Sequence, residues 1–428
     1  MSRNQSAFTS FILHIHPRTI PQETMRFGLS LGLGGMAATL FFLLCTTGLL
    51  QLLMYAPEVT QAYNSIERMY SEILLGGWVR NIHHWSANLL VVVMVLHVFR
   101  VLATGALTAE RRWNWLVGLV LFSLVLFANF SGYLLPWDQL AYWAITIFTS
   151  IVTYLPFIGP WLVELLRGGV EVGPETLANF FAIHVGLLPV LIFILTLYHF
   201  WLIRKSGGLI TGEAEDETPV RRVSTVPDLI VREAFAALLL VALVLLTAAV
   251  FDAPLGERAN PAMSPNPTKA AWYFMGIQEL LLHMTPLFAV CVVPLVTTLL
   301  LALLPFWKGA VLPGGKWFAG KKETARLIIA VFLVGLVLMG TTVVFDDVFF
   351  RQVDSTGSDN SLLYRGILPF LLSLASLGMG YWLLCVKFHK SRAEVVLAGV
   401  ALHFSFIFAL TVIGIWFRGA GMQLVLPF

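Results

Sequence analysis

Two histidines in the first quarter of the chain, His83 and His97, lie fourteen residues apart with an almost wholly apolar run between them. In an α-helix this spacing leaves the rings about 40° apart around the axis and roughly 21 Å apart along it. A second apolar run holds His184 and His199, fifteen residues apart. Two such helices, side by side across a hydrocarbon layer ~30 Å thick, would bring one histidine of each together near either face of the membrane. Each level therefore predicts a b-type haem whose iron is held by two axial imidazoles.

Two arginines flank the first pair symmetrically. Arg80 lies three residues before His83, and Arg100 lies three residues after His97. Ionisable residues at membrane depth are rare and tend to be functional, and these arginines would neutralise haem propionates. One histidine in an apolar helix is usually a hydrogen-bonded packing residue, but four at matched spacing favour two haems.

Four glycines repeat the spacing of the histidines. Gly34 and Gly48 lie in one apolar segment and Gly118 and Gly132 in another, each pair fourteen residues apart. Glycine lets a flat ligand or a neighbouring helix approach the backbone closely. Helix packing is the simpler explanation for one pair, whereas the shared spacing favours flat cofactors at two depths.

The composition is that of an integral membrane protein. Of the 428 residues, 58% are hydrophobic and 12% are charged. The net charge of +3 gives no reason to expect nucleic acid as a partner. Three single cysteines, none in a CxxCH motif, predict no covalently attached haem and no disulfide framework.

Long apolar runs predict an all-α fold with about nine transmembrane helices. The expected spans are residues 27–55, 77–105, 115–135, 180–203, 234–251, 286–307, 327–345, 367–388 and 395–417. A shorter apolar segment, 140–152, is expected to lie on the membrane surface. The predicted domains are an interfacial segment (1–26), a four-helix di-haem domain (27–203), a charged cytoplasmic linker (204–233) and a five-helix C-terminal domain (234–428).

Basic residues predict the orientation of these spans. Lys and Arg are concentrated in the loops around residues 111–112, 308–326 and 387–392, whereas the loop around residues 346–359 is acidic. By the positive-inside rule the N-terminus is cytoplasmic and the C-terminus lies outside, in the cell's inner membrane. His83 and His184 are then near the outer side, and His97 and His199 near the inner side.

Several motifs resemble cytochrome b of the bc1 and b6f (quinol–cytochrome c and quinol–plastocyanin reductase) family. They are HHWSANLLVVVMVLHVFR, SGYLLPWDQLAYWA, IGPWLVELLRGG and the spacing of His184 and His199. The first half looks closer to the b6f branch, fused here to a C-terminal half that resembles subunit IV. The resemblance implies that quinol is oxidised at an outer site, giving one electron to a Rieske iron–sulfur protein and one through the two haems to an inner quinone. It also implies a c-type cytochrome as a further partner and a homodimeric assembly.

The resemblance also implies where the quinones bind. The outer site would involve Tyr133, Trp272 and Tyr273, and the inner site would lie near His199, Arg204 and Asp228. A cation and a carboxylate there would bind or protonate a quinone anion, although both are also ordinary charges of a linker.

Two departures from the family pattern bear on function. The Pro-Glu-Trp-Tyr motif reads Ala270-Ala271-Trp272-Tyr273, so the glutamate that would take the quinol proton is absent. Glu279, or else His283, is the candidate replacement. Gly32 stands where the b6f branch has a cysteine for a third haem, which predicts that no third haem is held.

Two other classes of function are alternatives to quinol oxidation. The missing glutamate and the extra last helix are compatible with a di-haem membrane anchor that exchanges electrons between quinone and a different peripheral oxidoreductase. A transporter would show inverted repeats or broken helices around a midplane site, and neither pattern is visible. His84 directly follows His83, and the spacing to His97 selects His83 as the ligand.

Overall fold

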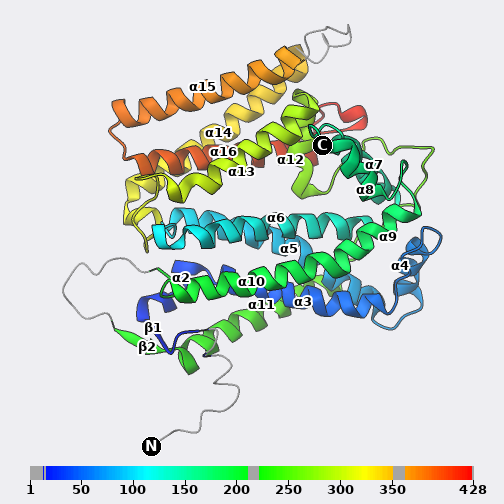
Figure 1. Ribbon diagram of the computed structural model, residues 1–428, viewed down its shortest axis with the longest axis horizontal. Helices are drawn as coiled ribbons and strands as arrows, with labels where there is room; N and C mark the ends of the chain where they lie inside the picture. Colours follow the sequence, from blue (N-terminus) through cyan, green and yellow to red (C-terminus); the bar gives the residue numbers. More distant parts are fainter. Residues whose placement is uncertain (1–12, 14–15, 211–220, 350–361, 427–428) are drawn as a thin grey trace, which may run out of the picture.

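The computed structural model describes residue 13 and residues 16–210, 221–349 and 362–426. Long helices aligned along one direction make up most of it (Figure 1). Within the described residues, nine helices are long and apolar enough to cross a membrane. The prediction of an all-α, multi-span membrane protein is confirmed.

The first four of the five N-terminal spans carry the histidine and glycine pairs. The bounds of the five are α3 (Leu33–Leu52), α5 (Gly76–Ala103), α6 (Arg112–Leu134), the continuous α9 (Pro174–Ala182), π-helical turn (Ile183–Leu187) and α10 (Leu188–Lys205), and α11 (Ile230–Val250). The first span begins later than predicted, because a short helix, α2 (Phe27–Ser30), ends at two left-handed residues. These are Leu31 (φ 52°) and Gly32 (φ 64°), and glycine adopts that conformation without a steric cost.

The remaining spans form the C-terminal part of the chain. They are α13 (Val293–Leu303) with the helical turns that flank it, α14 (Lys322–Phe349), α15 (Leu368–Trp382) with its flanking π-helical turns, and α16 (Arg392–Trp416). The shorter helices are α4 (Ala62–Ser71), α7 (Gln139–Val152), α8 (Gly159–Arg167) and α12 (Met275–His283). Helix α7 coincides with the predicted surface segment, whereas α4 and α8 were not predicted.

Helix α11 packs with the first four spans, although its place in the sequence assigned it to the C-terminal domain. Leu240, Val244 and Ala248 of α11 belong to the same buried cluster as Leu40 of α3 and Leu90 of α5. In Figure 1, α11 accordingly lies beside α3 and α10, apart from α13 to α16. The division of the sequence at residue 233 is therefore not a division in packing.

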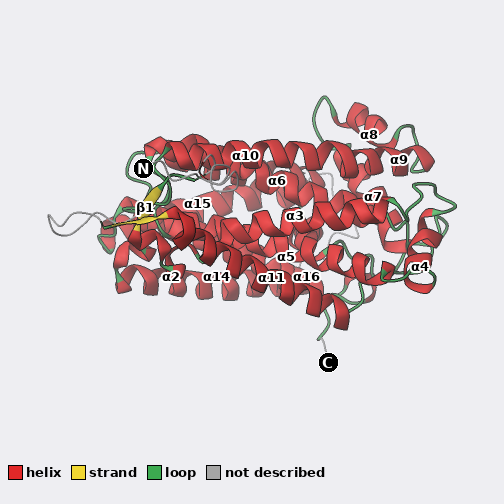
Figure 2. Cartoon of the chain, turned by 90° about the horizontal axis from the view of Figure 1, so that it is seen from below, coloured by secondary structure: helices red, strands yellow, loops and turns green. Residues whose placement is uncertain are grey.

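A small antiparallel ribbon joins the N-terminal segment to the predicted linker. Strand β1 (Thr19–Pro21) pairs with β2 (Arg222–Ser224), and helical structure resumes at Thr225. The helices thus leave residues 206–224 between them, against the predicted linker 204–233, and residues 211–220 lie outside the described part of the chain. In both Figure 1 and Figure 2 the ribbon lies at one end of the long helices, and α4 and α8 lie at the other.

Candidate haem and quinone sites

The two histidines predicted to lie near the outer side face each other. The ring centroids of His83 on α5 and His184 in the π-helical turn are 6.3 Å apart. One metal ion with bonds of ~2 Å to a nitrogen of each ring would span that gap. Each Nδ1 atom has a hydroxyl partner, Thr47 Oγ1 at 2.9 Å for His83 and Ser131 Oγ at 3.0 Å for His184. Such a partner orients a ligating imidazole and leaves Nε2 available to a metal.

The other two histidines form a second pair at the opposite depth. His97 and His199 are close enough to interact electrostatically, and both are half-buried. Nδ1 of His97 is buried and makes no hydrogen bond within the described part of the chain. A buried imidazole nitrogen without a partner is uncommon, and it suits a site whose ligand completes it.

Each of the four predicted glycines contacts one of the four histidines. A Cβ atom would lie 3.6 Å from His97 if added at Gly34 and 3.4 Å from His83 if added at Gly48. The same atom would lie 3.5 Å from His199 at Gly118 and only 2.6 Å from His184 at Gly132. Helix α3 thus accommodates the rings of α5, and α6 accommodates those of the π-helical turn and α10, at both depths.

The two flanking arginines are both buried but differ in their partners. Arg80 donates hydrogen bonds to the hydroxyl of Tyr70 and to the carbonyls of Ala253 and Pro254, at 2.7–2.8 Å. Arg100 donates from Nε to the carbonyl of Leu29, and its Nη2 atom is buried with no partner among the described residues.

These residues fit b-type haem at both levels. An iron porphyrin would find two imidazole pairs for its iron and a glycine against every imidazole ring. Its anionic propionates would find a buried guanidinium with an unused donor. Arg80 fits less directly than Arg100, since it already binds the loop that follows α11.

His84 points elsewhere and takes part in a different contact. Its Nε2 lies 3.2 Å from Nδ2 of Asn88, and Asn88 accepts a hydrogen bond from Nε1 of Trp272. Asn88 therefore links the helix that carries His83 to the Ala270-Ala271-Trp272-Tyr273 segment. The one sequence feature that points to this contact is a polar residue in an apolar run.

Of the residues predicted for the outer quinol site, Tyr133 and Tyr273 lie near each other, and the ring of Trp272 is 5.7 Å from that of Tyr273. Tyr133 and Phe274 pack on the same buried cluster as Phe130, and the rings of Phe130 and Phe274 are 5.7 Å apart. Burial raises the pKa of the Tyr273 hydroxyl and the nearby Tyr133 raises it further, so the hydroxyl stays protonated. Asp138 caps α7 through the amide of Ala141 and accepts a hydrogen bond from the amide of Gly256. The turn that contains Asp138 thus ties the surface helix to the loop after α11.

Glu279 lies in a different environment from Trp272 and Tyr273. Its carboxylate is fully buried, and both oxygens accept hydrogen bonds from the guanidinium of Arg418. His283 bonds to Glu279 at 3.2 Å and to Asp346 on α14 at 2.6 Å. Burial alone would raise the pKa of Glu279, but the hydrogen bonds from His283 and Arg418 outweigh it and hold the pKa below its usual value. Within the described residues, the hydrogen-bond partners of this carboxylate are Arg418 and His283 and none of the predicted quinol residues.

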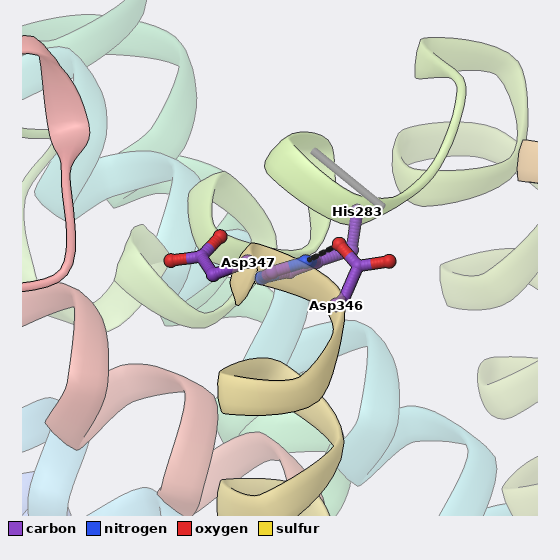
Figure 3. A group of neighbouring side chains, drawn as sticks. All are labelled: His283, Asp346 and Asp347. Atoms are coloured by element: carbon purple, nitrogen blue, oxygen red, sulfur yellow. Dashed lines mark hydrogen bonds and ion pairs between the residues drawn. The ribbon is translucent and has the colours of Figure 1, made fainter. Parts of the chain in front are cut away.

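His283, Asp346 and Asp347 have ligand atoms within 4.8 Å of one another, as a metal site would (Figure 3). Each carboxylate already faces a cationic or protonatable partner, however. His283 bonds to Asp346, and Arg418 pairs with Asp347. The group is therefore an ion-pair cluster, to which we assign no metal.

At the opposite end of the helices, the predicted inner residues lie at the ends of two spans. Arg204 is exposed in the last turn of α10, and Asp228 is exposed in the turn that precedes α11. His16 lies 3.8 Å from Glu233, and burial followed by the charge of Arg204 lowers its pKa. His16 and Glu233 thus join Arg204, a grouping that the sequence did not predict because it depends on the ribbon of β1 and β2.

The fold and these sites define a multi-span membrane protein built to bind haem. A family model described as "Cytochrome b/b6/petB" matches residues 22–207. Cytochrome b6 of Acaryochloris marina (strain MBIC 11017) is 42% identical over 175 residues, which are 41% of this chain and 81% of the relative. The chain belongs to the cytochrome b/b6 family, and it is therefore a haem-binding membrane oxidoreductase of electron transport.

A solved structure extends the likeness of fold to the C-terminal half. A chain of a structure titled "Hyperthermophilic respiratory Complex III" superimposes with a TM-score of 0.67 at 22% identity. The match covers 96% of this chain and 97% of that one. The arrangement of α13 to α16 is thus part of the shared fold.

Proposed function

We propose that this chain is a di-haem cytochrome b that oxidises quinol near the outer face of the membrane and passes electrons to a quinone near the inner face. The observation that carries the proposal is the pairing of α5 and α10 histidines at two depths, each ring against a glycine of a neighbouring helix. Bound haems would supply one-electron transfer between the two faces.

In this proposal the chain holds and insulates two b-type haems. His83 with His184, and His97 with His199, are the axial ligands, and Thr47 and Ser131 orient the outer pair. Gly34, Gly48, Gly118 and Gly132 leave room for the rings, while Arg80 and Arg100 balance propionate charge.

The outer quinol site is proposed to lie between the end of α6, the surface helix α7 and the segment 270–274. Tyr133, Trp272 and Tyr273 are proposed to line it, and Nε1 of Trp143 on α7 is a buried donor with no partner in the described chain. Hydroxyl and carbonyl groups of a quinol need such donors and aromatic walls. That Glu279 accepts the quinol proton stays a prediction, and its hydrogen bonds with Arg418 and His283 favour a structural role.

The inner quinone site is proposed near His199, Arg204 and Asp228. The grouping of His16, Arg204 and Glu233 supports it, because a cation beside protonatable side chains can stabilise and protonate a reduced quinone. With the N-terminus cytoplasmic and the C-terminus outside, electron transfer from the outer to the inner site would be coupled to proton translocation.

The assembly that we infer follows the family resemblance. A Rieske protein and a c-type cytochrome would take the other electron of each quinol, in a homodimer within the cell's inner membrane. We also retain the proposed domains, a di-haem part (27–203) followed by a linker and a C-terminal part, with α11 shared between them in packing.

Oxidant-induced reduction tests this function against the simpler di-haem anchor. The purified complex is supplied with quinol, its inner quinone site is blocked, and a pulse of ferricyanide is added while haem b absorbance is followed. Transient extra reduction of haem b is expected, because oxidising the high-potential branch forces the second electron into the b haems. Simple oxidation without that transient would instead identify an anchor with one linear electron path.

A further inference from the structure

We propose that the ninth span, α16, and the turn after it position the segment 269–283, which carries Trp272 and Tyr273 of the outer quinol site. This inference rests on the quinol oxidation proposed above. It gives a role to a helix that the electron path itself does not use.

Both ends of the segment are bound to the C-terminal end of α16. Nζ of Lys269 donates a hydrogen bond to the carbonyl of Ile415 at 2.8 Å. The last carbonyls of a helix lack intrahelical partners and carry partial negative charge, so they bind a cation well. At the other end, Arg418 binds the carboxylate of Glu279 through Nε and Nη2. Trp272 and Tyr273 lie between these two attachments.

Between the attachments, α12 and α16 approach each other closely. A Cβ atom at Gly276 would lie 2.9 Å from Oγ1 of Thr411 and 3.2 Å from the carbonyl of Ile407. A Cβ atom at Gly414 would lie 2.9 Å from Cε of Met275 and 3.3 Å from its carbonyl. Small residues on both helices thus permit backbone contact, which leaves α12 little freedom to shift.

The charges explain why Arg418 is the critical attachment. The side chains of Arg418 and Glu279 are both fully buried, and Arg418 also pairs with Asp347 and donates to the carbonyl of Met422. Removing one partner of a buried ion pair leaves an uncompensated charge in a medium of low polarity. Without Arg418, α12 would have to move to bring Glu279 to water, and Trp272 and Tyr273 would move with it.

The same contacts distinguish an anchor from a proton acceptor. Both oxygens of Glu279 already accept hydrogen bonds from a cation, and the carboxylate faces α16. An acceptor needs to reach the proton that it takes. Glu279 is therefore assigned as the point at which α16 holds α12.

The test compares Arg418→Gln with the triple variant E279Q/D347N/R418Q in the intact complex. The single variant strands two buried carboxylates, whereas the triple variant removes the cation together with both of its anions. A displaced quinol segment in R418Q is expected to raise the KM for quinol about tenfold or more. The dithionite-reduced haem b spectrum stays unchanged. The triple variant is expected to regain most of the wild-type KM and kcat.

Two further variants serve as controls. Arg68→Gln breaks an exposed ion pair with Glu72 at the same end of the molecule and should leave the KM unchanged. Arg418→Lys retains the charge without the planar guanidinium and should give a smaller rise in KM, which can be measured if R418Q does not assemble.

An unchanged KM in R418Q with normal haem content would overturn the inference. So would a triple variant that binds quinol normally but does not turn over, because the carboxylate of Glu279 would then be needed for chemistry. A wild-type complex that fails to oxidise quinol would remove the proposed function itself, and that outcome is seen before any variant is made.

Discussion

Oγ1 of Thr47 lies 2.9 Å from Nδ1 of His83. Thr47 directly precedes Gly48, the glycine that the same ring contacts. Ser131 bears the same relation to His184 and Gly132. The two helices that flank the outer histidine pair therefore use the same device, a hydroxyl that orients a ring and a glycine that leaves room for it. At the inner pair the residues before the glycines are Leu33 and Val117, whose side chains have no hydrogen-bonding group.

The first prediction follows from this contact. Thr47→Val keeps the shape of the side chain but removes the partner of His83 Nδ1, and loss of such an orienting group typically weakens metal binding about 10- to 100-fold. We expect the outer haem to be lost or weakened, while the inner haem is retained, in haem titrations followed by absorbance. Thr46→Val is the matched control, since Thr46 is exposed and bonds only to the carbonyl of Phe42. Equal haem affinity in the two variants would contradict the assigned orientation.

Gly132→Ala should disrupt the same haem by a steric route. The added Cβ would lie 2.6 Å from Cε1 of His184, so the ring or the helix must shift. Gly35→Ala, where no atom lies within 4 Å of the added carbon, is the control. A change of glycine to alanine inside a helix ordinarily stabilises it by ~1 kcal/mol, so a loss of haem at Gly132 alone would be specific. Full haem content in G132A would show that the ring is not held against α6.

The choice between the adjacent histidines His83 and His84 can be tested by spectroscopy. His83→Ala should abolish the low-spin spectrum of the outer haem. His84→Ala should preserve it, because His84 bonds to Asn88 and lies away from His184. The reverse result would identify His84 as the ligand, and the fourteen-residue spacing to His97 would then no longer hold.

The ion-pair cluster predicts a pH range of greatest stability. The pKa of Glu279 is lowered, so its stabilising effect is complete above its ordinary value of 4.5 and is lost as pH falls through the lower folded value. Burial alone would lower the pKa of His283, but the hydrogen bonds to Asp346 and Glu279 raise it. Its effect is complete below 6.5 and is lost as pH rises through the higher folded value.

The contribution of this cluster to the thermal stability of the complex should therefore be greatest between pH 4.5 and 6.5. The variant His283→Gln tests the alkaline side. The thermal stability of this variant should fall less steeply above pH 6.5 than that of the wild type, because the imidazole whose titration causes part of the decline is gone. An identical alkaline decline in wild type and variant would assign the titration to other groups.

Local pattern predicted the spans well, and it also supplies the candidate haem ligands, because each depends on residues within one helix. The fourteen-residue spacing of His83 and His97 is a property of a single segment, as are the apolar runs. The packing of α11 against α3 and α5 was not predictable in this way, because the sequence of a uniformly apolar helix does not indicate which helices it packs against. The pairing of β1 with β2 likewise joins residues about two hundred positions apart, such as Thr19 and Ser224.

The candidate sites follow the same division. Tyr133, Trp272 and Tyr273 were predicted from motifs, whereas Thr47 and Ser131 carry a signal that could have been read, a hydroxyl directly before each outer glycine. Glu279 was identified as the nearest carboxylate in sequence to the missing glutamate. Its cationic partner, Arg418, is 139 residues away, and proximity in sequence could not reveal that contact.

The packing of α11 bears on how the molecule assembles. Its side chains complete the buried cluster formed by α3, α5 and α6, yet the chain reaches it only after the linker. A cut between Lys205 and Thr225 would yield two polypeptides that share one hydrophobic core. Neither would be complete until they met in the bilayer. Covalent continuity fixes their ratio at one to one and keeps the local concentration of α11 high while the haem-binding bundle forms.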